Sequence, residues 1–213
     1  MSLSTEENEK PIIFNTEEVQ AILDGRKSQF RIVLKTVVKD IKKVEFNRRY
    51  NCVLTDENNW SFQVSNKYKI DDILYVRESV KVMSPPIETC RKMAFKYLAD
   101  NLYVDIVLDK EFDISKKWIQ RCQGIPNGCI KEMARIFLKV ANVKVERLQD
   151  INTEDILKEG ISYSEIGLYY YGKFRFSTAI EAWKHLWNST AKDGYKWEDN
   201  PYVFVYEFER IIK

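Results

Sequence analysis

Three cations close together in the sequence offer the clearest candidate chemistry in this chain. Lys27 follows Arg26 directly, and Arg31 lies four residues further on. A lysine that is near other cations and partly removed from water has a lowered pKa and can serve as a general base. The alternative is an ordinary exposed lysine just after a helix, where the dipole favours a cation. Both interpretations remain open for Lys27.

Glu159 is the second candidate, because its position is unfavourable for a carboxylate. It follows the predicted helix 153–158 and precedes Gly160, so it lies at the negative end of that helix. A glutamate there is a poor choice unless a cation pairs with it. The alternative is a solvent-exposed glutamate in a charged stretch, which is the commoner case.

Two further groups of charged residues lie at the ends of predicted strands. Arg77 and Glu78 follow the β-rich run 73–76. Arg77 can bind a phosphate or carboxylate with two hydrogen bonds, and Glu78 can accept one from a base amino group. The equally plausible alternative is an ion pair between the two. Arg135 precedes the next long strand and is either a phosphate contact or a rim residue.

The segment 169–175 interleaves aromatic and cationic side chains around Tyr170. Bases stack on aromatic rings while cations hold the phosphates, so this composition suits a single-stranded nucleic acid. The alternative is a loop folded over the core with its rings buried, which is the commoner arrangement of aromatic clusters.

A short helix and a strand must position the first candidate. Asn15 can cap the helix and Glu18 can complete a capping box. Gly25 follows the last apolar residue, where a helix favours a left-handed residue. The run 32–38 is rich in branched residues and predicts a strand. The cations between helix and strand are then expected on a mobile, exposed rim.

The rest of the chain predicts many short strands and a few helices. The pattern predicts an α+β protein, mainly β, organised as a β-barrel with flanking helices. Residues 84–121 form a segment between barrel strands, which we call the excursion. It is predicted to contain a β-hairpin in which residues 93–97 pair with residues 102–108. The other predicted elements are a strand over 73–76, a strand over 134–145, a helix over 153–158, a helix capped by Ser177, and a strand over 202–208.

Charge is nearly balanced overall but unevenly placed. The net charge is +2, whereas residues 25–49 contain nine lysines and arginines against two acidic residues, a net +7. This asymmetry suggests a surface that faces phosphates. A solvated strand face with lysine stems over apolar area is the alternative.

Composition excludes several classes of protein. No segment approaches the roughly 20 apolar residues of a membrane span. Residues 1–10 are polar and are treated as a disordered or tag-like N-terminus. The four cysteines form no C-x-x-C pair and there is one histidine, so we expect free thiols, no metal site and no cofactor in a cytoplasmic protein.

The segment ILDGRKSQFR resembles the glycine-x-lysine signature of the ASCH domain, a PUA-like β-barrel family linked to RNA. Four further groups of residues resemble phage or prophage-type members of that family. They lie at 75–78, at 97–100, at 134–135 with 145–151 and 159–161, and at 200–205. The resemblance implies a single PUA-like domain over residues 11–213, with the excursion as an insertion.

The resemblance also implies a site. In the family the matching lysine and glutamate line one cleft, so Lys27 and Glu159 would form an acid/base or substrate-orienting pair. We expect Arg31, Arg77 and Glu78 to line the same cleft, which would bind RNA or a nucleotide. The oligomeric state is left open.

One enzyme branch of the family hydrolyses the acetyl amide of N4-acetylcytidine with a Lys-Thr-Glu arrangement. The threonine position is Phe30 here, which has no nucleophile, so the sequence favours binding over catalysis. A water or Ser28 would have to substitute, and amidohydrolase activity is kept as the alternative. A phage-derived protein-interaction module, with the excursion as its interface, is the third hypothesis.

Overall fold

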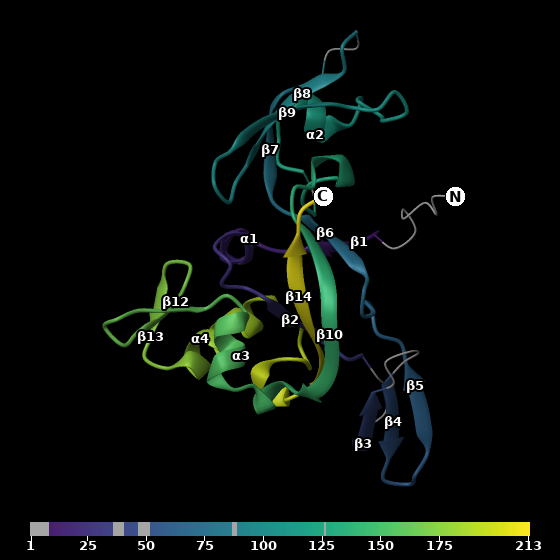
Figure 1. Cartoon of the computed structure of the whole chain (residues 1–213), viewed down its shortest axis with the longest axis vertical. Coiled ribbons are helices and arrows are strands. Elements are labelled where there is room, and N and C mark those ends of the chain that lie inside the picture. Colours follow the sequence, from purple (N-terminus) through teal and green to yellow (C-terminus); the bar gives the residue numbers. More distant parts are fainter. Residues whose placement is uncertain (1–8, 36–40, 47–51, 87–88, 126) are drawn as a thin grey trace. The chain divides into compact units, whose positions relative to one another are not determined.

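The computed structural model describes residues 9–35, 41–46, 52–86, 89–125 and 127–213 (Figure 1). Over these residues the chain is mainly β with four α-helices, which confirms the predicted class. It divides into two compact units. The first unit comprises Met1–Leu23, Ile73–Leu138 and Arg210–Lys213, and the second comprises Asp24–Asp72 and Lys139–Glu209. The single domain over residues 11–213 stays a prediction.

The first unit contains a parallel strand pair and a three-stranded antiparallel sheet. β1 (Glu9–Ile13) pairs in parallel with β6 (Ile73–Arg77). β1 includes the last two residues of the 1–10 segment, while residues 1–8 lie outside the described part. The sheet has the order β7 (Val80–Ser84), β8 (Lys92–Tyr97), β9 (Tyr103–Val107). The pairing of β8 with β9 confirms the hairpin predicted inside the excursion.

Helix α1 (Thr16–Leu23) has the predicted capping box. The backbone N–H of Glu18 donates to Asn15 Oδ1 at 2.8 Å, and the backbone N–H of Asn15 donates to Glu18 Oε2 at 3.0 Å. Two free N–H groups of the first turn are thereby satisfied. Gly25 follows with φ +75°, the left-handed conformation that the sequence predicted for it.

Short helices complete the first unit. They are α2 (Lys117–Gln120) and the 3-10 helix η2 (Lys131–Met133). Apolar side chains from the sheet and these helices form the core of this unit, with Phe95 and Met133 fully buried. Because η2 and its cap at Ala134 precede it, the strand expected from residue 134 begins only at Phe137.

Two long strands have residues in both units. They are β10 (Phe137–Arg147) and β14 (Tyr202–Ile211). In the second unit β14 pairs antiparallel with β2 (Gln29–Val33). β2 therefore begins three residues before the strand predicted over 32–38, and residues 36–40 lie outside the described part.

Two more three-stranded sheets belong to the second unit. One has the order β3 (Ile41–Phe46), β4 (Cys52–Asp56), β5 (Ser61–Val64). The other has the order β11 (Ser162–Tyr163), β12 (Tyr169–Tyr171), β13 (Phe174–Phe176). The described strands lie in open sheets and do not close into the barrel that we expected.

Helices α3 (Thr153–Lys158) and α4 (Ala179–Thr190) pack together in the second unit, beside the β12–β13 hairpin (Figure 1). Asn152 caps α3 by accepting from the N–H of Asp155. The cap of α4 is Thr178 and not Ser177, because Thr178 Oγ1 accepts from the N–H of Glu181 and the Glu181 carboxylate closes the box. The 3-10 helices η3 (Leu148–Asp150) and η4 (Trp197–Asp199) precede α3 and β14.

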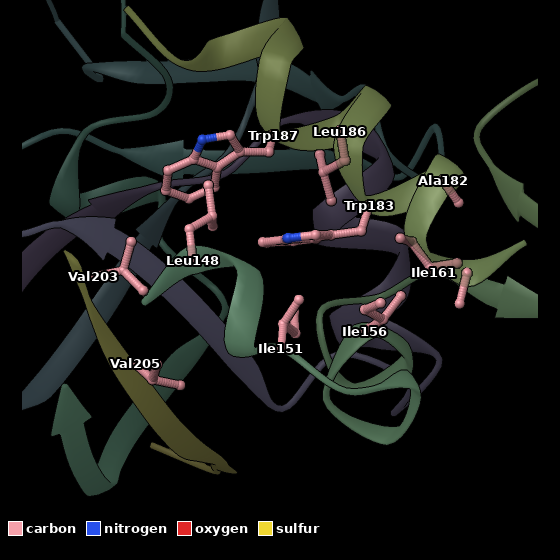
Figure 2. Packing of buried hydrophobic residues seen from close by; sticks show 11 residues of the cluster. Leu148, Ile151, Ile156, Ile161, Ala182, Trp183, Leu186, Trp187, Val203 and Val205 are labelled. Carbon is pink, nitrogen blue, oxygen red and sulfur yellow. The ribbon is translucent and has the colours of Figure 1, made fainter. Parts of the chain in front are cut away.

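The core of the second unit is centred on Trp183 (Figure 2). Its ring lies among Leu148, Ile151 and Ile156 and is 2% exposed. Trp187, one turn later on α4, extends the same cluster toward Val203. This core holds α4 against α3 and fixes the ends of both helices.

Candidate ligand-binding site

Residues 27–31 alternate between two environments, as a strand requires. Lys27, Gln29 and Arg31 share one face and are 3%, 0% and 8% exposed. Phe30 lies on the opposite face, stacked on Tyr206 with ring centroids 4.9 Å apart. Of the three cations expected on a mobile rim, Lys27 and Arg31 are therefore buried and Arg26 is exposed. Lys27 lies two residues before β2, in an isolated bridge to Glu159, whereas Arg31 lies within β2, which β14 pairs with from Gln29 onward.

Lys27 and Glu159 are in direct contact, although 132 residues separate them in the sequence. Lys27 Nζ donates to Glu159 Oε2 at 3.0 Å and to the Glu159 carbonyl at 2.9 Å. Their backbones also form an antiparallel bridge. Glu159 caps the C-terminus of α3, so Lys27 supplies the cation that a carboxylate at this helix end requires.

Arg31 is the centre of the same cluster. Its Nη1 donates to Glu159 Oε1 at 2.6 Å, and its Nη2 donates to Glu146 Oε1 at 2.7 Å and to Asp155 Oδ2 at 3.3 Å. Its guanidinium lies 5.6 Å from the Trp183 ring centroid. Burial opposes the charge on Arg31, but the carboxylates of Glu159 and Glu146 outweigh it and raise the pKa of Arg31 above its ordinary value.

Lys144 completes the cluster from β10. Its Nζ lies 3.1 Å from Glu146 Oε2 and 3.3 Å from Asp155 Oδ2. Burial opposes its charge as well, yet its two carboxylate partners raise the pKa of Lys144. We call this set of side chains the ion cluster. Its three cations and three carboxylates are Lys27, Arg31, Lys144, Glu146, Asp155 and Glu159.

Because its charges balance, the ion cluster carries no net charge to attract a phosphate. Its most buried members are also enclosed, since the side chains of Lys27 and Arg31 are 0% exposed. The cluster can instead fix the start of β2 and the end of α3 in one geometry.

Two buried donors beside the cluster have no hydrogen-bond partner among the described residues. They are Gln29 Nε2 and Trp183 Nε1. Gln29 Oε1 accepts from Arg31 Nη1 at 2.7 Å, which fixes the orientation of the amide and leaves its NH₂ without an acceptor. A buried donor left in this state costs about 1–3 kcal/mol.

Exposed cations and an aromatic ring collect next to the ion cluster. Arg26 is exposed, and its Nη1 donates to the Gly160 carbonyl at 2.7 Å, directly after Glu159. Ser162, two residues further on, pairs with Tyr170, which pairs in turn with Arg175. Arg26 and Tyr170 thus border the same segment, residues 160–162.

The β12–β13 hairpin divides its side chains between the core and the surface. Tyr169 and Tyr171 pack against the apolar cluster. Strand alternation places Tyr170 on the opposite face, half-buried, with Arg175 opposite and exposed. We call this set the hairpin surface, made of Arg26, Tyr170, Lys173 and Arg175.

The other predicted site residues belong to the first unit. Glu78 is 1% exposed and accepts two hydrogen bonds from Arg135, both at 2.8 Å. Arg135 also donates to Asp100 at 2.6 Å and lies 3.8 Å from the Tyr97 ring centroid. Burial opposes the charge on Arg135, but Glu78 and Asp100 raise its pKa. Glu78 therefore pairs with Arg135, and the guanidinium of Arg135 is bound by Glu78 and Asp100 within the protein.

Arg77 has different partners from those expected. It donates to the carbonyls of Cys129 at 2.9 Å and Gly128 at 3.3 Å. The alternative of an Arg77–Glu78 pair is wrong, because Glu78 turns to Arg135 instead. A single cleft shared by these residues with Lys27 stays a prediction.

The basic strip over residues 25–49 is only partly described. Lys27 and Arg31 are buried, while Lys42 and Lys43 are exposed and bound to Asn59 and Glu45. Lys39, Arg48 and Arg49 lie outside the described residues.

The sequence reasoning missed Gln29, Lys144, Glu146, Asp155 and Trp183 as members of the site. The signal for Gln29 was the alternation of polar residues at 27, 29 and 31, which a strand places on one face. The other four lie more than a hundred residues further along the chain, and no local pattern links them to β2.

Comparisons with models of protein families, with curated proteins and with solved structures find no match to this chain. The resemblance to the ASCH family therefore stays a prediction. Within the described ranges, no helix has the length and apolar character needed to cross a membrane, and no group of three metal-ligating side chains is present. All four cysteines are free, as predicted.

Proposed function

We propose that this chain is an RNA-binding module of the ASCH, PUA-like type, and that the hairpin surface binds single-stranded RNA. The observation that carries the proposal is the position of Tyr170 on the outer face of the hairpin, opposite Arg175 and beside the segment that Arg26 binds. An aromatic ring flanked by cations is the arrangement on which bases stack while phosphates are neutralised.

The ion cluster has a positioning role in this proposal. Lys27 and Arg31 hold Glu159 from two sides, and the segment 160–162 follows it directly. The segment that carries the hairpin surface therefore starts from a fixed point. The basic residues of the 25–49 strip add phosphate contacts in the proposal, with Lys27 and Arg31 excepted because they are buried.

Binding of labelled single-stranded RNA, followed by fluorescence anisotropy, tests the proposal. Tyr170→Ala removes the stacking ring and should weaken binding about 5- to 150-fold, since one stacked base contributes about 1–3 kcal/mol. The matched control is Tyr103→Ala, which removes an exposed tyrosine that also lies beside a lysine, but in the first unit. Equal effects of the two substitutions would refute the assignment to the hairpin.

An amidohydrolase acting on a modified nucleoside such as N4-acetylcytidine is a second candidate, which the Lys27–Glu159 contact favours. The environment of Phe30 argues against it. That residue is 4% exposed within an aromatic cluster, on the strand face opposite Arg31. The test is acetate release from N4-acetylcytidine. If the protein releases acetate and Glu159→Gln abolishes that release, our preference for a binding function is overturned.

A protein-interaction module is the third candidate, and exposed apolar side chains of the excursion favour it. Leu102, Tyr103 and Val107 are 48%, 62% and 73% exposed on and beside strand β9, which is an edge strand. Sedimentation velocity over a range of protein concentrations tests self-association through this edge. A monomer at all concentrations, together with RNA binding, would favour the first proposal.

A further inference from the structure

A cavity of about 270 Å³ lies in the second unit, between β2 and the C-terminal end of α4. Its lining comes from two short stretches of chain. From β2 and the residues after it come Val33 and Lys35, and from the end of α4 and its following loop come Trp187, Ala191, Lys192 and Tyr195.

The floor of this cavity is apolar and firmly held. Trp187 is 7% exposed and belongs to the apolar core, against which Val33 and Ala191 also pack. Trp187 Nε1 donates to the Tyr195 carbonyl at 2.8 Å, which ties the loop to the helix. The cavity is therefore formed before any ligand binds, as in most small-molecule sites.

The rim of the cavity is cationic. Lys35 and Lys192 are exposed, and neither forms an ion pair with any described residue. The acidic residue Asp193 follows Lys192 in the sequence, but its side chain is exposed and does not line the cavity. An apolar floor with two available cations at its edge complements an anion that carries a flat apolar body.

We infer that this cavity binds one nucleotide, with its base against Val33, Trp187 and Ala191 and its phosphate between Lys35 and Lys192. The choice of a nucleotide rests on the proposed function, whereas the position of the site rests on the cavity. The volume lies just below the roughly 300–1,000 Å³ of sites for drug-sized ligands, which suits one nucleotide and not two. Cationic hydrogen bonds to phosphate supply the polar part of the affinity.

Isothermal titration calorimetry with a nucleoside 5′-monophosphate tests the inference on the full chain. The matched probes are the unphosphorylated nucleoside and inorganic phosphate. We expect the nucleotide to bind at least tenfold more tightly than either probe. Equal affinity for inorganic phosphate and the nucleotide would overturn the inference, because the base would then contribute nothing.

Variants assign the binding to this cavity. Lys35→Gln combined with Lys192→Gln should weaken nucleotide binding at least tenfold, and both side chains are exposed, so folding should be unaffected. The control is Lys81→Gln, an exposed lysine of β7 in the first unit. Unchanged affinity in the double variant would overturn the inference.

The same samples separate this inference from the proposed function. Tyr170→Ala should weaken RNA binding and leave monophosphate binding unchanged. RNA binding without monophosphate binding refutes the cavity and leaves the hairpin proposal standing. Monophosphate binding that the lysine variants abolish, without RNA binding, supports the cavity and refutes the RNA-binding module.

Discussion

Replacing Glu159 by glutamine should destabilise the second unit strongly, because this carboxylate joins two buried cations. Its Oε1 accepts from Arg31 at 2.6 Å and its Oε2 accepts from Lys27 at 3.0 Å. Glutamine has nearly the same volume but keeps only one acceptor oxygen, and its NH₂ group faces a cation. Glu159 is 2% exposed, so water cannot replace the lost partner.

The expected loss is about 3 kcal/mol of unfolding free energy. Removing one partner of a buried ion pair costs about 3–5 kcal/mol, and the remaining amide oxygen places Glu159→Gln at the lower end. Arg31 also keeps Glu146 and Asp155, which limits the loss. For a chain of this size, about 3 kcal/mol corresponds to a fall in Tm of about 6–12 °C.

Urea unfolding followed by circular dichroism and tryptophan fluorescence measures the change. The control is Glu154→Gln, which removes a 78% exposed carboxylate paired with Lys158 and should change stability by less than about 0.5 kcal/mol. A loss below about 1 kcal/mol for Glu159→Gln would refute the view that the ion cluster fixes this part of the fold.

Three smaller predictions concern single positions. Gly128→Ala should lower the Tm far more than Gly25→Ala. Both glycines have a positive φ, but only a Cβ at position 128 would lie 2.4 Å from a backbone carbonyl oxygen. Equal losses of stability in the two variants would contradict this. Hydrogen bonds from Arg135 lower the pKa of Asp100 in the folded protein below its ordinary value of 3.8. The Asp100 carboxylate therefore stabilises the fold above pH 3.8, and this stabilisation is lost as the pH falls through the lowered pKa. Asp100→Asn should therefore flatten the acid side of the stability–pH curve measured by urea midpoints, and an unchanged curve would count against the pairing. Burial raises the pKa of Cys129 to about 11, so a thiol reagent should modify exposed Cys90 in the native protein and Cys129 only after unfolding; simultaneous modification would contradict the burial.

Local features of the fold could be predicted from the sequence because their signals lie within a few residues. The capping box of Asn15 and Glu18 and the hairpin in the excursion both follow from short-range hydrogen bonding and turn chemistry. The cap of α4 shows the limit of this reasoning. Ser177 and Thr178 are chemically alike, and the structure selects Thr178, whose Oγ1 accepts from the N–H of Glu181.

The ion cluster could not be predicted, because it depends on pairing between distant segments. The sequence places Lys27 and Arg31 in a basic stretch, which favours an exposed loop. They are buried because β14 pairs with β2 and because α3 brings Asp155 and Glu159 to the same face. Three carboxylates compensate the cations, and none of them is near in the chain. The Lys27–Glu159 contact was expected only through the resemblance.

The salt dependence of RNA binding tests the proposed module most directly. The hairpin surface has three exposed cations, Arg26, Lys173 and Arg175. For a single strand, the slope of log K against log salt is about −0.7 per neutralised phosphate, so these three contacts contribute about −2, and each contact from the 25–49 strip makes the slope steeper. Arg175→Gln should bring the slope about 0.7 closer to zero. Binding that is absent, or that shows neither a salt slope nor any effect of Tyr170→Ala, would contradict RNA binding by this surface.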